Sequence, residues 1–246
     1  MSMTKRHLSV ALLAVLAILA VPAGAQAITV YAAASLRDAF PRIDAAPTYS
    51  FLGSNQLQAQ IERGAPADVF ASASPNEAGA LFREGLCTRP VTFATNVVVL
   101  ITPKGNPSGI RSVYTLRTGS RRLSVGTAGV PIGAYTRQIL ARLRLTSILR
   151  SNRVSLDPNV AAITAKVALG SADAGFVYAT DAQSVADRTE VIALPRWSQP
   201  PVRYQMCVVR RRGADTANAD RFMRRVLASR GRSILKRFGF GIPPRG

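Results

Sequence analysis

Hydrogen-bond donors at expected helix starts are the residues of this chain whose types and spacing could do chemistry. Ser35 follows the apolar run 28–34, and Ser54 follows the strand-like run 48–52 and Gly53, so each serine is placed where a strand leads into a helix. The first N–H groups of a helix have no partner inside it, and the helix dipole adds partial positive charge there. Such a terminus suits an anion. A plain N-cap is the alternative for each serine, and Asp38 would complete a capping box with Ser35.

The same arrangement recurs in the second half of the chain. After the expected strand 123–126, Pro131 fits the first helical position, which leaves the backbone N–H of Ile132 free. Further on, we expect Asp157 to cap a helix that begins at Pro158, with the N–H of Val160 in its first turn. One such terminus would indicate only a helix cap, but the repetition favours a site built from several of them.

The alternation of strands and helices predicts the elements that position these groups. It indicates an α/β fold in which each half is a mostly parallel sheet with helices on both faces. Tyr178 ends the buried strand 175–178, so its hydroxyl is expected at the carboxyl end of the sheet. Ligands of such sheets lie outside the carboxyl ends of the strands.

Two long β-rich runs, 91–102 and 202–209, are expected to cross between two lobes. We therefore predict lobe 1 from residues 28–93 plus 204–246 and lobe 2 from residues 94–203, with a ligand held between them. Hinge closure at the two crossing strands would follow.

Residues 1–27 have the features of a signal peptide: a basic start, an apolar stretch from Leu8 to Val21, and the cleavage signal Ala25-Gln26-Ala27. We expect an exported protein, periplasmic or extracytoplasmic and soluble after cleavage near Ala27. Removal of this segment leaves a formal charge of +17, since it holds two of the 32 basic residues and no acidic one. The basic residues are mostly scattered arginines without interleaved aromatic residues, so no nucleic-acid partner is expected.

The rest of the composition excludes several kinds of site. The single histidine, His7, lies in the signal segment, which excludes His-dependent triads and His metal ligands from the mature chain. We expect no catalytic residue, no direct metal ligand and no cofactor. The two cysteines, Cys87 and Cys207, suggest one disulfide in an exported protein, with two buried thiols as the alternative. Cys87 precedes the first crossing run and Cys207 lies in the second, so adjacent crossing strands would bring them together.

Several stretches resemble the periplasmic molybdate-binding proteins of ABC importers, which have a two-lobed periplasmic-binding-protein fold. The resemblance covers nearly the whole mature chain in the same order. It is carried by ITVYAAASLRDAF, FLGSNQLQAQIERGAPADVFASAS, FATNVVVLITPKGNP, GVPIGAYTRQIL and NVAAITAKVALGSADAGFVYATDA.

The resemblance implies a monomer that binds molybdate or tungstate through neutral donors and delivers it to a membrane permease. The implied donors are the hydroxyl and N–H groups of Ser35 and Ser54, the N–H groups of Ile132 and Val160, and the hydroxyl of Tyr178. Two departures from the family matter. Residues 41–49 are short, which predicts a truncated first helix, and Ile132 stands where the family has a small residue, which would narrow the pocket.

Three alternatives remain at this stage. The same fold could bind another oxyanion such as sulfate, and Ile132 favours that smaller ion. A secreted enzyme, for example a glycosidase with paired carboxylates, is disfavoured because acidic residues are few and Asp68 and Asp181 have the character of structural residues. A basic protein that adheres to an anionic surface is the third.

Overall fold

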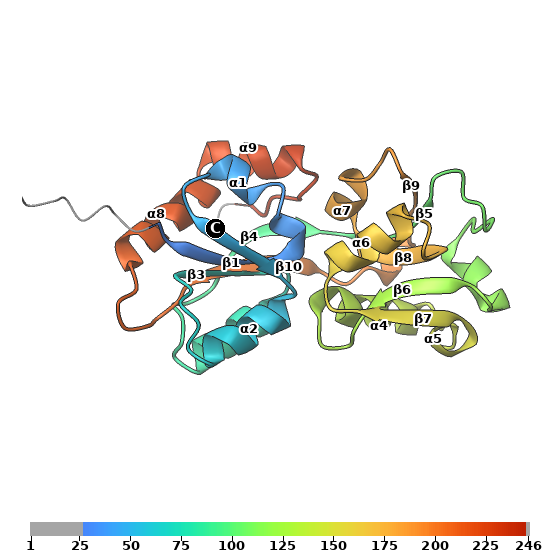
Figure 1. The fold of residues 1–246 in the computed structure, drawn as a ribbon, viewed down its shortest axis with the longest axis horizontal. Coiled ribbons are helices and arrows are strands. Elements are labelled where there is room, and N and C mark those ends of the chain that lie inside the picture. The colour runs from blue at the N-terminus through green and yellow to red at the C-terminus, as the bar shows by residue number, and fades with distance from the viewer. Residues whose placement is uncertain (1–26, 245–246) are drawn as a thin grey trace, which may run out of the picture.

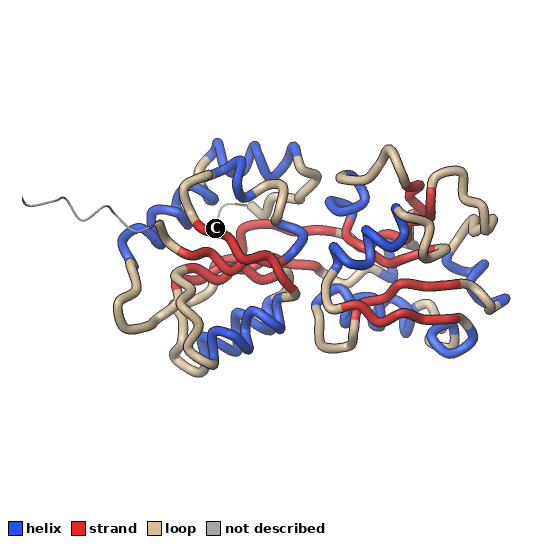
Figure 2. Tube along the Cα trace, viewed as in Figure 1, coloured by secondary structure: helices blue, strands red, loops and turns tan. Residues whose placement is uncertain are grey.

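The structure, a computed structural model, describes residues 27–244 as two α/β lobes side by side, each with a five-stranded sheet covered by helices on both faces (Figures 1 and 2). The predicted signal segment lies outside the described residues except for Ala27. Within the described part, no helix has the length and apolar character needed to cross a membrane. The α/β two-lobed fold is confirmed.

The first sheet has the order β2-β1-β3-β10-β4, and the second has the order β7-β6-β8-β5-β9. The strands of the first are β1 (Thr29–Ala33), β2 (Thr48–Leu52), β3 (Val69–Ser72), β4 (Val91–Asn96) and β10 (Val202–Val208). Those of the second are β5 (Val98–Pro103), β6 (Arg122–Gly126), β7 (Arg153–Asp157), β8 (Ala174–Tyr178) and β9 (Thr189–Ile192).

Helices α1, α8 and α9 lie on one side of the first sheet and α2 on the other (Figure 1). The helices of this lobe are α1 (Phe40–Ile43), α2 (Ser54–Glu62), α3 (Pro75–Arg83), α8 (Thr216–Leu227) and α9 (Ser229–Arg237), with the 3-10 turn η1 (Ala34–Leu36). The other lobe contains α4 (Pro131–Arg142), α5 (Ile148–Ser151), α6 (Val160–Ala168) and α7 (Ala179–Gln183), with η2 (Val113–Thr118) and η3 (Arg196–Ser198). The truncated first helix is confirmed, because α1 has only four residues.

Both sheets are mixed, although four strands of each run in the same direction. The pairs β1·β2 and β1·β3 are parallel, whereas β10 is antiparallel to both β3 and β4. In the second sheet β6 is parallel to β7 and β8, whereas β5 is antiparallel to β8 and β9. The reversed strand in each sheet is one that a connection between the lobes brings in.

The first connection is the run 91–102, which divides at Val97 into β4 of the first sheet and β5 of the second. The second long run does not cross. β10 lies entirely in the first sheet, with Val202 opposite Asn96, and the chain returns through residues 193–201. Below, lobe 1 denotes residues 27–96 and 202–244, and lobe 2 denotes residues 97–201.

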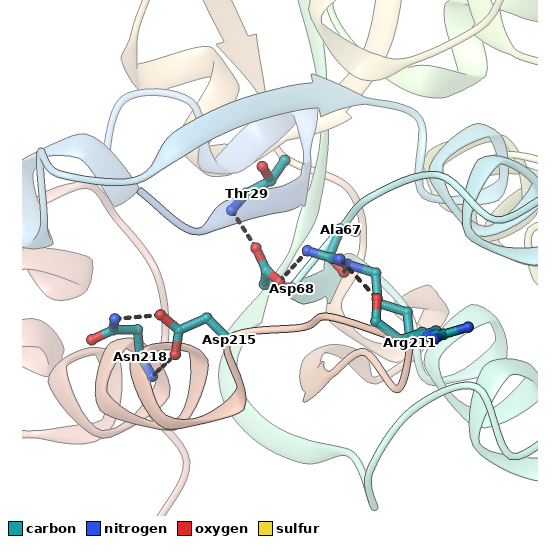
Figure 3. Close-up of polar contacts among 7 residues, drawn as sticks. Thr29, Ala67, Asp68, Arg211, Asp215 and Asn218 are labelled. Carbon is teal, nitrogen blue, oxygen red and sulfur yellow. Dashed lines mark hydrogen bonds and ion pairs between the residues drawn. The ribbon is translucent and has the colours of Figure 1, made fainter. Parts of the chain in front are cut away.

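The buried Asp68 fixes the start of the first sheet, which agrees with the structural role expected for it. Its carboxylate accepts hydrogen bonds from the Thr29 backbone N–H, at 2.8 Å, and from the Arg211 guanidinium, at 2.6 Å (Figure 3). Arg211 also donates to the Ala67 carbonyl, at 3.1 Å. The pair therefore joins the residues before β3 to the start of β1 and to the segment after β10.

The disulfide between Cys87 and Cys207 is present, with the two Cα atoms 5.9 Å apart. Both cysteines are fully buried in a small apolar cluster with Leu57, Phe70 and Leu81, beneath α2 and α3. Cys207 lies on β10, and Cys87 forms an isolated bridge with Val209 just beyond that strand. The crosslink therefore lies within lobe 1 and not between the lobes.

The C-terminal helical segment divides at Ala228 into α8 and α9. Gly231 is buried inside α9, and a Cβ on it would lie 2.2 Å from the Arg225 carbonyl oxygen. This glycine permits α9 to pack closely on the last turn of α8. Asp215 caps α8 by accepting from the Asn218 N–H at 3.0 Å (Figure 3).

Candidate ligand-binding site

A small pocket lies between the lobes and contains all five predicted ligand residues in its wall. About 230 Å³ in it is not filled by protein atoms, part of this volume being open to solvent. Lobe 1 contributes residues after β1, at the start of α2 and after β3, and lobe 2 contributes the first residues of α4 and α6 and the end of β8. The lining residues are Ala33, Ala34, Ser35, Leu52, Gly53, Ser54, Ala73, Val130, Pro131, Ile132, Asn159, Val160 and Tyr178.

Ser54 is the first residue of α2, and Gly53 is the N-cap, so the predicted cap is displaced by one residue. Gly53 is required there because a Cβ would lie 2.5 Å from the carbonyl oxygen of Pro158 in the other lobe. Ser54 is buried, and its Oγ accepts a hydrogen bond from the Ala73 N–H at 3.1 Å. Because the Ser54 hydroxyl oxygen accepts this bond, its proton remains available for donation into the pocket.

Ser35 does not cap a helix, so this prediction is wrong. It lies inside the 3-10 turn η1, whose N-cap is Ala33, and the capping box with Asp38 is not formed. The Ser35 Oγ instead lies 2.8 Å from the hydroxyl oxygen of Tyr204, on β10. Tyr204 is distant in sequence, which is why local spacing could not reveal this partner.

Ile132 is the second residue of α4, which begins at Pro131 as predicted. Its N–H belongs to the first helical turn, where no intrahelical acceptor exists. The Ile132 side chain is buried, and its Cγ2 would lie 2.9 Å from a Cβ on Gly126. The absence of a side chain on Gly126, at the end of β6, therefore makes room for Ile132 next to the pocket.

Val160 is the first residue of α6, but the predicted cap and start of this helix are wrong. Asn159 is the N-cap and accepts from the Ala162 N–H at 3.0 Å, and Pro158 precedes the helix. Asp157 ends β7 and is engaged elsewhere, because it accepts from the Ser124 hydroxyl at 2.6 Å and pairs with Lys166. The N–H of Val160 keeps its place in the first turn.

Tyr178 ends β8, as predicted, and is buried with 1% of its surface exposed. Its hydroxyl has no hydrogen-bond partner among the residues that the structure describes. Burial raises the pKa of this phenol well above its ordinary value, so the group keeps its proton and remains a donor. Rings of Tyr135 and Tyr204 flank it, with centroids 6.5 and 5.8 Å away.

The pocket wall carries no charge, since none of the residues that line it is Asp, Glu, Lys or Arg. No group of three or more His, Cys, Asp or Glu residues suitable for a metal ion occurs between residues 27 and 244. Asp181, in α7, lies outside the pocket wall and is buried, which raises the pKa of its carboxyl to about 7. Neutral donors therefore define the chemistry of this pocket: it suits a ligand rich in acceptors.

The sequence predicted five residues that the structure places in the pocket wall, but it missed other residues that shape or support the pocket. Gly53 sets the close approach of the lobes, Asn159 caps α6, and Tyr204 holds Ser35. The signal for Asn159 was present, since Asp157-Pro158-Asn159 offers two candidate caps. Tyr204 gave no local signal, because its contact with Ser35 depends on β10 entering the first sheet.

Comparison with known proteins is consistent with this geometry. Residues 28–241 match the model of the bacterial extracellular solute-binding protein family. The chain is 36% identical over 230 residues to the molybdate-binding protein ModA of Mycobacterium tuberculosis, covering 89% of this chain and 86% of that protein.

Two solved structures share the fold. The periplasmic molybdate-binding protein of Azotobacter vinelandii superposes with a TM-score of 0.77 at 24% identity, covering 88% of this chain and all of that one. The sulfate-binding protein SubI of M. tuberculosis superposes with a TM-score of 0.71 at 16% identity, covering 87% and 86%. The chain belongs to the bacterial extracellular solute-binding protein family and is a homologue of molybdate-binding proteins.

Proposed function

We propose that this protein captures molybdate or tungstate between its lobes and delivers it to the permease of an ABC importer. One observation supports the proposal: five residues with neutral hydrogen-bond donors, from both lobes, line a pocket whose wall has no charged residue. Ser35 and Ser54 would donate through hydroxyl and N–H groups, Ile132 and Val160 through N–H groups, and Tyr178 through its phenol. Because its relatives are binding proteins, the protein is not an enzyme.

The donor set supports a fully deprotonated tetrahedral anion. Each hydroxyl can turn to donate, so every oxygen of such an ion can be satisfied without a counter-charge. Phosphate carries a proton near neutral pH, and that proton would face donors with no acceptor to receive it. An unpaired buried polar group costs about 1–3 kcal/mol, so phosphate is expected to be rejected.

Sulfate is the second candidate, because it also lacks a proton at neutral pH and because a sulfate-binding protein shares the fold. Size separates it from molybdate. A cleft fitted to the larger ion leaves the oxygens of sulfate short of some donors, whereas a pocket narrowed by Ile132 would favour sulfate. Ile132 lines the pocket with its Cγ2 next to Gly126, so the selectivity between the two ions is left to the titration below.

Calorimetric titration of the purified mature protein with molybdate, tungstate, sulfate and phosphate tests the proposal. We expect molybdate and tungstate to bind far more tightly than sulfate, and phosphate to give no measurable heat. Sulfate binding as tight as molybdate binding would overturn the molybdate assignment and leave an oxyanion-binding protein. No binding of any of the four ions would overturn the oxyanion site itself.

The export signal and the relatives support action outside the cytoplasmic membrane, and we expect the protein to be a monomer there. The predicted partners are the oxyanion and a membrane permease, with no nucleic acid. Size-exclusion chromatography with light scattering would test the monomer, and fractionation of the producing cell would test the location.

A further inference from the structure

The two pocket serines are alike in needing a hydrogen bond that fixes which way each hydroxyl donates. For Ser54 that bond is unambiguous, because a backbone N–H can only donate, and the Ala73 N–H donates to Ser54 Oγ. For Ser35 the partner is the Tyr204 phenol, in which either oxygen could be the donor. The direction of the Ser35–Tyr204 bond therefore decides whether Ser35 can serve an anion.

Asn96 sets that direction. A backbone hydrogen bond fixes the orientation of its amide, because the Val97 N–H can only donate and it donates to Asn96 Oδ1 at 3.0 Å. The Asn96 Nδ2 group must then be the end that meets the Thr180 hydroxyl oxygen, at 3.0 Å, and the Tyr204 hydroxyl oxygen, at 3.4 Å. An amide nitrogen only donates, so Tyr204 accepts from Asn96.

A phenol that accepts from one side has its own proton for the other side. Tyr204 is fully buried, and burial keeps its pKa well above the ordinary value, so the proton is present. That proton is directed to Ser35 Oγ, which in turn leaves the Ser35 proton for the pocket. The three hydrogen-bonding groups therefore donate in one direction: the Asn96 amide to the Tyr204 phenol, and the phenol to the Ser35 hydroxyl.

We infer that Tyr204, oriented by Asn96, is a positioning residue that makes Ser35 a hydrogen-bond donor toward the bound oxyanion. This inference rests on the proposed function and extends it to two residues outside the pocket wall. Asn96 ends β4 where the chain leaves lobe 1, Thr180 belongs to lobe 2, and Tyr204 lies on β10. The hydrogen bonds that direct Ser35 therefore join both lobes beside the first crossing.

Tyr204→Phe tests the inference because it removes only the hydroxyl. The ring contacts with Phe93, Tyr178 and Phe240, at centroid distances of 5.4–6.1 Å, can be kept. We expect molybdate affinity to fall about tenfold, the value of one ordinary hydrogen bond. Tyr49→Phe is the matched control. Its phenol in the same lobe donates to the Asp44 carbonyl at 2.6 Å, away from the pocket, so affinity should be unchanged.

A double-mutant cycle separates positioning from general loosening of the cleft. If Tyr204 acts through the Ser35 hydroxyl, Tyr204→Phe should change affinity less than twofold once Ser35→Ala is present. Equal losses on both backgrounds, or no loss from the single change, would overturn the inference. Should Tyr204→Phe fail to fold, Asn96→Ala replaces it in the same cycle, with a smaller coupling of the same sign expected.

The parent protein is titrated with molybdate and with sulfate in the same series. If the parent binds molybdate but the affinity losses of Tyr204→Phe and Ser35→Ala simply add, the positioning role is overturned and the proposed ligand stands. Binding of sulfate only would overturn the proposed ligand, and the cycle with sulfate would then decide the positioning role. Binding of neither ion would overturn both proposals.

Discussion

Strand for strand, β1, β2 and β3 of lobe 1 correspond to β6, β7 and β8 of lobe 2, and the correspondence extends to side chains. Asp68 precedes β3 and accepts from the N–H of Thr29, which opens β1. Asp173 precedes β8 and accepts from the N–H of Arg122, which opens β6, at 2.8 Å. Each aspartate also pairs with an arginine guanidinium. In both sheets, therefore, an aspartate before the third strand binds the first backbone N–H of the first strand and pairs with an arginine.

The pocket ends of the same strands differ. Ser35 and Ser54, after β1 and β2, line the pocket from lobe 1, and Ile132 and Val160, after β6 and β7, line it from lobe 2. The proposed donors are hydroxyls in the first pair and backbone N–H groups in the second. A helix fixes the direction of an N–H, whereas a hydroxyl rotates and needs a neighbour to orient it. Ser35 and Ser54 of lobe 1 therefore need supporting hydrogen bonds from Tyr204 and Ala73, whereas Ile132 and Val160 of lobe 2 need only a helix start. The Tyr178 hydroxyl, also in lobe 2, has no supporting partner among the described residues.

A second difference between the lobes is covalent. Only lobe 1 contains the disulfide, which joins residues 120 apart in sequence. We expect Cys87→Ala with Cys207→Ala to lower the free energy of unfolding by about 4–5 kcal/mol in the chain-entropy view. Urea unfolding followed by hydrogen exchange should show the loss concentrated in β3 and β10. Two titratable thiols in the denatured, unreduced protein would contradict the crosslink.

Buried carboxylates give a prediction for lobe 2. Asp68 of lobe 1 is ion-paired, whereas burial, with Asp38 nearby, raises the pKa of Asp181 to about 7 from 3.8. Between those values the folded state holds a proton that the unfolded state has lost, so stability falls as pH rises from about 4 to 7. We expect Asp181→Asn to gain about 2–4 kcal/mol over the parent above pH 7 and almost nothing at pH 4.

Thermal unfolding of both proteins across that pH range is the measurement for Asp181. Asp187→Asn is the control, because Asp187 is an exposed residue of the same lobe and should leave the curve unchanged. If Asp181→Asn gained as much stability over the parent at pH 4 as at pH 8, ionisation of Asp181 would carry no stability cost and the prediction would fail.

Side-chain and backbone donors should respond differently to truncation. We expect Ser54→Ala to weaken molybdate binding by about 1.5–3 kcal/mol, the value of a hydrogen bond to a charged group. Val160→Ala retains its N–H, so it should weaken binding much less than Ser54→Ala does, although the loss of a buried side chain lowers stability. Calorimetric titration of both variants with molybdate measures the two affinities. Equal losses of affinity would contradict the proposed division between side-chain and backbone donors.

Asp215→Ala is a control for the loss of a helix cap in lobe 1. Asp215 is a true N-cap, accepting from the Asn218 N–H at 3.0 Å at the start of α8, and it does not line the pocket. Its loss should cost about 1 kcal/mol of stability with little change in affinity. A fall in affinity comparable to that of Ser54→Ala would show that cap loss alone disturbs the cleft.

The contact between the lobes at Gly53 gives the last prediction. The backbone of Gly53, with φ −63° and ψ 137°, suits alanine, but a Cβ would lie 2.5 Å from Pro158 O. We expect Gly53→Ala to weaken molybdate binding by about 1–3 kcal/mol through overpacking, with ligand-free stability nearly unchanged. Gly79→Ala, in α3, is the control. Unchanged affinity in Gly53→Ala would mean that the lobes need not approach this closely.

The sequence predicted the strands well, and the five residues it singled out lie in the pocket wall, because both depend on local patterns. Residues 48–52 form β2 as expected, and Pro131 begins α4. Prediction failed where a distant group decides the outcome. Ser54 is not the cap because Pro158 from the other lobe requires Gly53, and Asp157 is not a cap because Ser124 and Lys166 engage it. Neither contact has a signature in the neighbouring sequence.

The reversed strand β10 lies between β3 and β4, and this position has a consequence for the order in which the protein can assemble. As the chain emerges from its N-terminus, every strand of lobe 2 is available before residue 202 appears, so that lobe can complete its sheet first. The first sheet must wait with a gap between β3 and the edge strand β4, both unpaired on that side until the final strand arrives. Closure of that gap also brings Cys207 to Cys87, so oxidation of this pair reports that the last strand has taken its place.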